Sequence, residues 1–151
     1  MGEIQIEQLL DQGNTVSIKP QGHSMYPMFI PGRDEAILEK AEPSRLKRGD
    51  VVLYRRDQGI LVIHRIIRST EEGFYLVGDN QHEIEGPLRP DQMKGVLTAF
   101  IRNGRYVSVR NPVYRAASHL WLFLCPVRVP LKNFVASWKR RIRGRREGKR
   151  E

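Results

Sequence analysis

The sequence predicts a mainly β protein: an antiparallel β domain with a short N-terminal helix and a C-terminal basic amphipathic helical appendage. Two observations carry this prediction. Between residues 14 and 110, short apolar and β-branched runs alternate with clusters of Gly, Asp, Asn and Pro, as in strands joined by turns. Apolar residues recur at helical spacing only near the two ends of the chain. We therefore divide the chain into a β domain, residues 1–110, and an appended region, residues 111–151.

The first dozen residues read as a short helix, because Ile6, Leu9 and Leu10 share one helical face and Gly13 offers a stop. Strands then follow one another, separated by turn residues. The expected strands are residues 15–19, 35–39, 51–55, 60–68, 74–77, 96–101 and 106–109. The Asn-Gly pair at 103–104 marks a hairpin between the last two.

The appended region begins at Asn111-Pro112, which suits a helix N-cap and the first helical position. Apolar residues recur at helical spacing after it, first across 113–124 and again across 131–142, where Lys and Arg are interspersed. Residues 139–151 hold eight Lys or Arg and two Glu, a net charge of +6 out of +9 for the whole chain. Such a segment is typical of a helix lying in a membrane interface.

Three interpretations of this basic region stay open. The first is contact with an anionic membrane surface through residues 112–146. The second is a helix packed on the β domain with a solvated basic end. The third, nucleic-acid binding, is the least favoured, because no aromatic stacking platform or DNA-reading motif accompanies the charge.

Length and composition limit the number of domains, the disulfide bonds and the membrane-spanning segments that the chain can have. The 151 residues allow one domain with an appendage, and the single cysteine, Cys125, excludes an intramolecular disulfide. The N-terminus does not resemble a signal peptide, and no run approaches the roughly 20 apolar residues of a spanning helix. We expect a cytoplasmic or peripheral-membrane protein without a conventional transmembrane helix, and neither a cofactor nor a metal.

A candidate nucleophile, Ser24, lies in the segment Gly-His-Ser-Met-Tyr-Pro at 22–27, on a turn after an expected strand. A serine hydroxyl needs a base within hydrogen-bond reach to become an effective nucleophile. Gly22 would allow a substrate to approach the backbone, and the Ser24 N–H could bind an oxyanion. Gly22 and Met25 are therefore the expected oxyanion and substrate-binding positions. The alternative is a serine that only satisfies its own loop.

His64 is the candidate general base. Strand alternation places it with Ile60, Val62 and Ile66 on one face of the 60–68 strand. An apolar face disfavours the charged imidazole, and the neutral ring is the form that accepts a proton. The alternative is a hydrogen-bonded core histidine.

Asp79 is the candidate acid. It lies in a Gly-Asp-Asn turn after the 74–77 strand and could accept the other imidazole N–H of His64. The same residue could instead only stabilise its turn. Glu83, Glu85 and Asp91 follow in the same loop and could substitute for Asp79.

Four segments together resemble the type I signal peptidase family and its relatives, the repressor-type self-cleaving peptidases. Residues 21–27 resemble the nucleophile box, 49–54 the strand before the base, 62–67 the base box and 76–80 the acidic box. Histidine at the base position resembles the branch found in archaea, in the endoplasmic reticulum and in some spore-formers.

The resemblance implies an antiparallel β domain of signal-peptidase type and a serine endopeptidase. It would cleave a signal or leader peptide after a small residue, by acyl transfer through Ser24, with His64 as base and Asp79 in support. Two other functions stay open. One is a self-processing peptidase of the repressor type, and the other is a non-catalytic, membrane-associated β scaffold for interactions.

Overall fold

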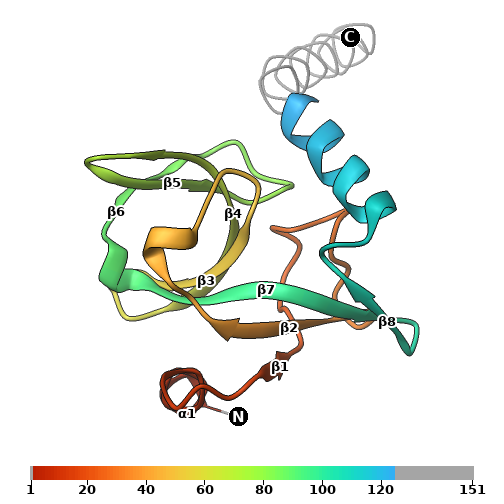
Figure 1. The fold of residues 1–151 in the computed structure, drawn as a ribbon, viewed down its shortest axis with the longest axis horizontal. Coiled ribbons are helices and arrows are strands. Elements are labelled where there is room, and N and C mark those ends of the chain that lie inside the picture. Colours follow the sequence, from red (N-terminus) through yellow and green to blue (C-terminus); the bar gives the residue numbers. More distant parts are fainter. Residues whose placement is uncertain (1, 125–151) are drawn as a thin grey trace, which may run out of the picture.

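The computed structural model describes residues 2–124, which form one antiparallel sheet with a helix at each end (Figure 1). The sheet has eight strands, ordered β1-β2-β7-β3-β4-β5-β6, and β8 pairs with β7. The first elements are α1 (Glu3–Asp11), β1 (Val16–Ile18), β2 (Asp34–Lys40), β3 (Val51–Arg55) and β4 (Leu61–Thr70). The others are β5 (Gly73–Val77), β6 (Glu85–Leu88), β7 (Met93–Arg102) and β8 (Arg105–Ser108). Short 3-10 turns lie at Pro43–Arg45 and Pro90–Gln92. The expected mainly β, antiparallel class is confirmed.

One strand was not expected from the sequence. β6 contains a Gly-Pro pair at 86–87, which reads as a turn signal. It forms the outer strand beside β5, where Phe74 pairs with Leu88 and Leu76 with Glu85. A sheet edge tolerates proline because one side of the strand needs no ladder hydrogen bond. This strand brings Glu85 to the sheet.

The core lies on both faces of β3, which is paired with β4 on one side and β7 on the other. Val51 and Leu53 enter the larger apolar cluster, and Val52 and Tyr54 enter the smaller one. All four side chains are buried. Because His64 is opposite Val52 in the ladder, its ring is on the side of the smaller cluster. The expected alternation along β4 is therefore confirmed at this residue.

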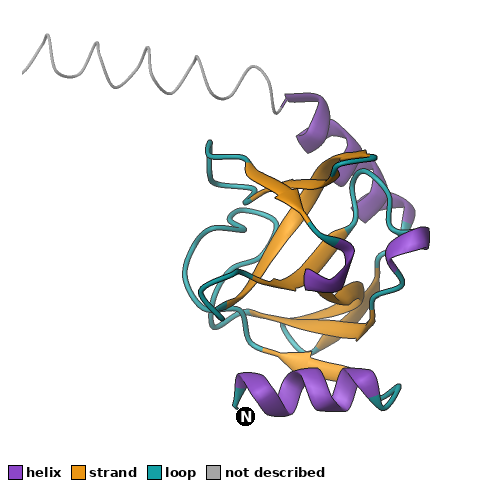
Figure 2. Cartoon of the chain, turned by 90° about the vertical axis from the view of Figure 1, so that its left-hand side faces the viewer, coloured by secondary structure: helices purple, strands orange, loops and turns teal. Residues whose placement is uncertain are grey.

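The two helices lie at opposite ends of the molecule (Figures 1 and 2). The second begins at residue 112 and continues to the last described residue, 124. Asn111 is its N-cap, as expected, since the Asn111 Oδ1 accepts the N–H groups of Val113 at 2.9 Å and Tyr114 at 3.3 Å. The expected stripe at 131–142 and the basic tail lie outside the described residues. Among the described helices, none combines the length and the apolar character that crossing a bilayer requires.

Candidate active site

Ser24 lies in the loop of bends and turns, residues 19–33, between β1 and β2. Two buried side chains, Met25 and Phe29, hold this loop on the larger apolar cluster. The Phe29 N–H also donates to the Met25 carbonyl at 2.8 Å. Ser24 itself is half-buried, and Gly22 before it is exposed with a φ of +75°, which favours glycine. The serine is therefore accessible at one end of a well-anchored loop.

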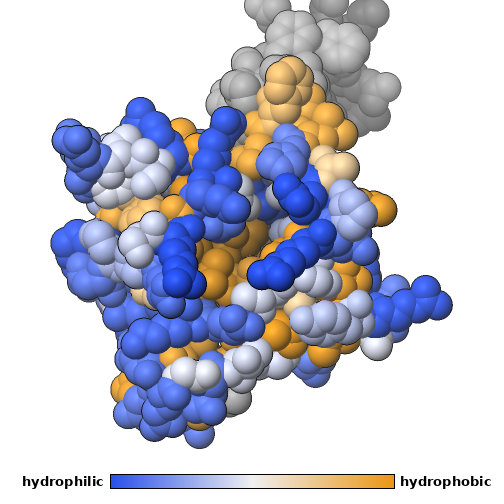
Figure 3. Space-filling model, viewed as in Figure 1, coloured by the Kyte–Doolittle hydropathy of each residue, from blue (hydrophilic) through white to orange (hydrophobic). Residues whose placement is uncertain are grey.

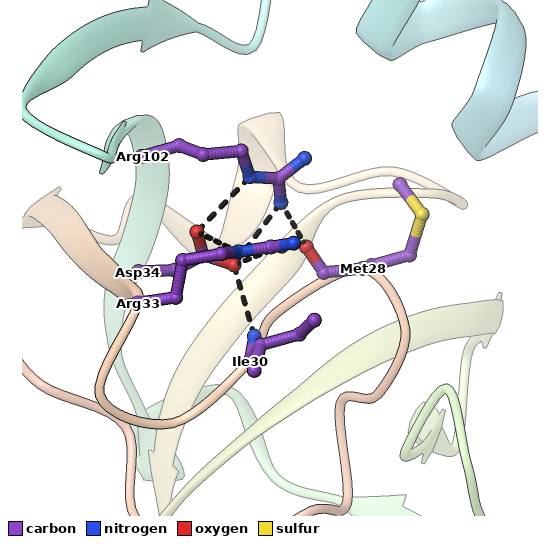
Figure 4. Close-up of polar contacts among 5 residues, drawn as sticks. All are labelled: Met28, Ile30, Arg33, Asp34 and Arg102. Carbon is purple, nitrogen blue, oxygen red and sulfur yellow. Dashed lines mark hydrogen bonds and ion pairs between the residues drawn. The ribbon is translucent and has the colours of Figure 1, made fainter.

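The far end of this loop is fixed by a buried carboxylate (Figure 4). Asp34 accepts hydrogen bonds from the Arg33 and Arg102 guanidinium groups and from the Ile30 N–H at 2.9 Å. Arg102 Nη2 also donates to the Met28 carbonyl at 2.6 Å. Burial alone would raise the pKa of Asp34, but these hydrogen bonds outweigh it and lower the pKa to about 2.

The Gly-Asp-Asn turn lies directly against the Ser24 backbone. The Asn80 N–H donates to the Ser24 carbonyl at 2.7 Å. A Cβ on Gly78 would lie 2.7 Å from the same oxygen, so only glycine permits this approach. Arg65 pairs with Val77, and continuing that register by one residue sets His64 opposite Gly78. The Ser24 backbone thus lies next to the strand position that carries His64.

The His64 ring is buried, with 1% of its surface exposed, and its two nitrogens differ. Nδ1 lies 3.0 Å from the Tyr54 hydroxyl, which donates its own hydrogen to Glu85 Oε2 at 2.7 Å. The hydroxyl must then accept the hydrogen of Nδ1, which leaves Nε2 with the lone pair. Nε2 is buried and has no hydrogen-bond partner among the described residues. Arg56 donates to Glu85 at 2.8 Å and completes the chain of contacts.

This environment keeps the imidazole neutral. Burial lowers the pKa of His64 from its ordinary value of 6.5 to about 4. The negative charge of Glu85 acts in the opposite direction and raises the pKa, while the positive charge of Arg56 lowers it. At neutral pH the ring is therefore a proton acceptor.

Asp79 differs from the sequence-based expectation. Both of its carboxylate oxygens accept hydrogen bonds from Arg65, from Nε and from Nη2, each at 2.8 Å. Arg65 is as buried as its partner, and its Nη1 also donates to Ser118 Oγ at 2.6 Å and to the Gly49 carbonyl. The direct hydrogen bond expected between Asp79 and His64 is replaced by the Tyr54–Glu85 contacts. A fully buried guanidinium required the bidentate partner that Asp79 provides.

Sequence reasoning missed Tyr54, Arg56 and Arg65. It did include Glu85 among the alternatives to Asp79. Tyr54 lies in a strand that is apolar up to Arg55, and its neighbours in the sequence give no sign of a role at the site. The available signal was strand pairing: in the β3–β4 hairpin Val52 is opposite His64 and Tyr54 is opposite Val62, which places Tyr54 and His64 diagonally on one face.

The Ser24 hydroxyl forms no hydrogen bond with His64 or with any other described side chain. The N–H groups of Ser24 and Met25 likewise have no acceptor among residues 2–124. Gly22, Ser24 and Met25 all line one cavity of about 520 Å³.

That cavity is a largely apolar groove bounded by α1, β1 and the first residues of β4, with Glu3, Lys19 and Gln21 as polar lining residues. Its walls include Ile18, Phe29, Leu53, Leu61 and Ile63. β1 is at the edge of the sheet, and β5 pairs with β4 only from residue 65 onward. Two strand edges with open backbone groups therefore border the groove beside Ser24.

Within residues 2–124, no group of three or more His, Cys, Asp or Glu side chains is arranged to hold a metal ion. Comparison with known proteins finds no matching family model, no similar curated protein and no similar solved structure.

Proposed function

We propose that this protein is a serine endopeptidase of signal-peptidase type, which cleaves a signal or leader peptide after a small residue. Ser24 is the nucleophile and His64 the general base. The state of the His64 ring carries the proposal: it is buried and neutral, with Nδ1 held by Tyr54 and Nε2 without a partner among the described residues. A purely structural core histidine would have both nitrogens paired.

In the first step, the Ser24 hydroxyl oxygen bonds to the carbonyl carbon of the scissile peptide, and its proton moves to His64 Nε2. The carbonyl oxygen becomes an oxyanion, for which the N–H groups of Ser24 and Met25 are the available donors. The C–N bond then breaks, and Nε2 returns the proton to the leaving amine. A water molecule, activated by the same nitrogen, releases the acyl group from Ser24.

The supporting chain runs from Nδ1 through Tyr54 to Glu85. It holds the tautomer that leaves the lone pair on Nε2, and Glu85 compensates the positive charge that the ring gains during the reaction. Asp79 acts less directly: with Arg65 it fixes the turn that contacts the Ser24 carbonyl. Hydrogen bonds between a nucleophile and its base are often absent before substrate binds, and close in the complex.

The substrate is an extended peptide. Main-chain groups at the edges of β1 and β4 can pair with such a chain laid in the groove. The apolar walls suit small and aliphatic side chains near the scissile bond.

The test is a digestion of a peptide library, carrying small residues before candidate bonds, by the full chain in detergent or liposomes. Ser24→Ala and His64→Ala should each abolish cleavage, and an acyl adduct on Ser24 should appear by mass spectrometry. Ser44→Ala and His82→Ala, both exposed and outside the groove, are the matched controls and should remain active.

Two results would redirect the proposal. A shortened intact mass of purified wild type, absent in Ser24→Ala, would indicate the self-processing peptidase instead. Cleavage that survives Ser24→Ala, or no cleavage of any library member by folded wild type, would contradict the peptidase assignment and favour the non-catalytic scaffold.

A further inference from the structure

The helix at residues 112–124 is apolar on the side that does not contact the sheet. Its inner side uses Tyr114, Ser118 and Leu122, of which the last two are buried. On the outer side, Val113 and Phe123 are each 76% exposed and Leu120 is 59% exposed. The outer residues follow helical spacing and are all exposed: Val113, Ala116, Ala117, Leu120, Phe123 and Leu124. Figure 3 shows apolar side chains gathered over this helix.

Single apolar residues on a surface are ordinary, but a continuous row of six is not. A helix that only covered the β domain would carry polar residues on its outer side. The outer row therefore indicates a second contact, made outside the described fold.

Unpaired positive charge borders the same helix. A cavity of about 610 Å³ lies between the helix and the sheet, and its lining includes Lys47, Arg48, Arg110 and Arg115, with Asp50 as the one acidic side chain. None of the four cations forms an ion pair with a described residue, and each is exposed. The Asp50 carboxylate accepts the Lys47 backbone N–H at 2.9 Å, so its role is local.

We propose that the outer face of helix 112–124 docks on an anionic membrane surface, with the four cations of the adjoining cavity binding lipid phosphates. Apolar side chains that enter the acyl boundary beside cations at headgroup level are the features of an interfacial helix. The apolar row is on the helix itself. The cations come from the helix (Arg115), from just before it (Arg110) and from the loop before β3 (Lys47 and Arg48).

Other binding partners account for either the apolar row or the cations, but not for both. A nucleic acid would pair with the cations but leave the apolar row in water. A second copy would cover the apolar row, but a two-fold contact brings the same surface of each copy together and would set the two basic cavities close to each other. An anionic lipid surface accommodates both.

The inner side of the helix connects this surface to the candidate active site. Ser118 Oγ accepts a hydrogen bond from Arg65, and Trp121 Nε1 donates to the Asp79 carbonyl at 3.2 Å. Docking would thus hold the groove at a constant height above the bilayer. Lipid binding is measured without turnover, so its outcome is independent of the proposed peptidase reaction.

The test is co-sedimentation of the full chain with vesicles of phosphatidylcholine alone and of equal parts phosphatidylcholine and phosphatidylglycerol. Wild type should bind the anionic vesicles more tightly, with an affinity that falls as salt rises. The double variant Leu120→Gln/Phe123→Gln and the double variant Arg110→Gln/Arg115→Gln should each weaken this binding by about tenfold or more. All four positions are exposed, so unchanged thermal melting should verify the fold.

The matched control is Arg105→Gln/Tyr106→Gln on β8, which removes an exposed cation and a 68% exposed apolar residue elsewhere. It should bind like wild type. Equal binding by wild type and both helix variants would overturn the proposal and assign any lipid affinity to another part of the chain. Absence of vesicle binding, or a concentration-dependent dimer that only the helix variants abolish, would overturn it as well.

Discussion

At the scale of single residues, the two nitrogens of His64 have separate roles. Nδ1 is held by a phenol that is itself held by a carboxylate, and Nε2 is left as the basic nitrogen. Burial keeps the His64 ring neutral, and the hydrogen bonds to Tyr54 and Glu85 select the tautomer with the proton on Nδ1. Both effects are needed for the ring to accept a proton at Nε2.

The pKa of His64 predicts an acid limb for kcat/KM near pH 4, well below the 6.5 of an ordinary histidine. Activity requires the neutral ring, so it should be lost as the pH falls through that value. Glu85→Gln removes a negative charge that raises the pKa of His64, so the limb should move to lower pH. The maximal rate should fall by about tenfold or more, because the charge that supports the imidazolium is gone.

A pH–rate profile of wild type and Glu85→Gln measures both effects. Glu83→Gln, two residues away and exposed, is the matched control and should reproduce the wild-type profile. A limb that stays in place or rises in Glu85→Gln would contradict the proposed influence of Glu85 on His64.

The local sequence around Ser24, His64 and Asp79 marks each as a candidate, and the fold brings their backbones into one region. The partner of His64 could not be predicted in the same way. An aspartate in a turn after a strand is equally suited to support a catalytic base and to form an ion pair. Asp79 forms an ion pair because the guanidinium of Arg65 is buried beside it. Which charges are buried depends on the packing of the whole chain, so it could not be predicted from the sequence.

At the scale of elements, the loop that carries Ser24 depends on its two ends. Met25 and Phe29 anchor it through the apolar cluster, and Asp34 anchors its exit through hydrogen bonds to two arginines. The outcome is a fifteen-residue loop, 19–33, that lacks regular structure but is held in place at both ends.

Asp34→Asn should lower the free energy of unfolding by about 2 kcal/mol or more, because two guanidinium groups lose a buried charged partner. The pKa of Asp34 is about 2, below its ordinary value of 3.8. The contribution of the Asp34 carboxylate to the free energy of unfolding is therefore complete above pH 4 and is lost as the pH falls through 2.

Urea denaturation at several pH values should show this decline in wild type and not in Asp34→Asn. Asp57→Asn, whose carboxylate is 71% exposed, should behave like wild type. An Asp34→Asn midpoint equal to wild type would refute the anchoring role.

Elements differed in how well the sequence predicted them. The apolar strand β3 was predicted with both of its ends, and β4, predicted at residues 60–68, has its ends displaced by one and two residues. β6 was missed because Gly86-Pro87 is a turn signal in isolation, and only pairing with β5 makes the segment a strand. A strand was predicted where its own residues favour the extended conformation, and it was missed where only pairing with a neighbour imposes that conformation.

At the scale of the whole molecule, one buried ion pair joins the sheet, the Gly-Asp-Asn turn and the C-terminal helix. Arg65 comes from β4, its carboxylate partner from the turn after β5, and Ser118 from the helix. Asp79→Asn should therefore lower the free energy of unfolding by about 3 kcal/mol or more, since it leaves a buried cation without its counter-charge.

Chemical denaturation of Asp79→Asn measures this loss, with Asp91→Asn, 71% exposed, as control. If Asp79 instead acted chiefly by supporting His64, the variant would be as stable as wild type and would lose only activity. That outcome would restore the direct contact expected from the sequence.

The neighbouring positions of His64 and Arg65 also constrain how the chain can misfold. A shift of β4 by one residue would exchange the two faces and press a guanidinium into the apolar cluster beside Tyr54. The same shift would deprive Asp79 of its cation. A mispaired sheet would therefore bury two charges without partners, and only the correct pairing brings Tyr54 beside His64. The register of β4 and the positions of His64 and Arg65 are therefore set together, so a folded form with β4 out of register should not accumulate.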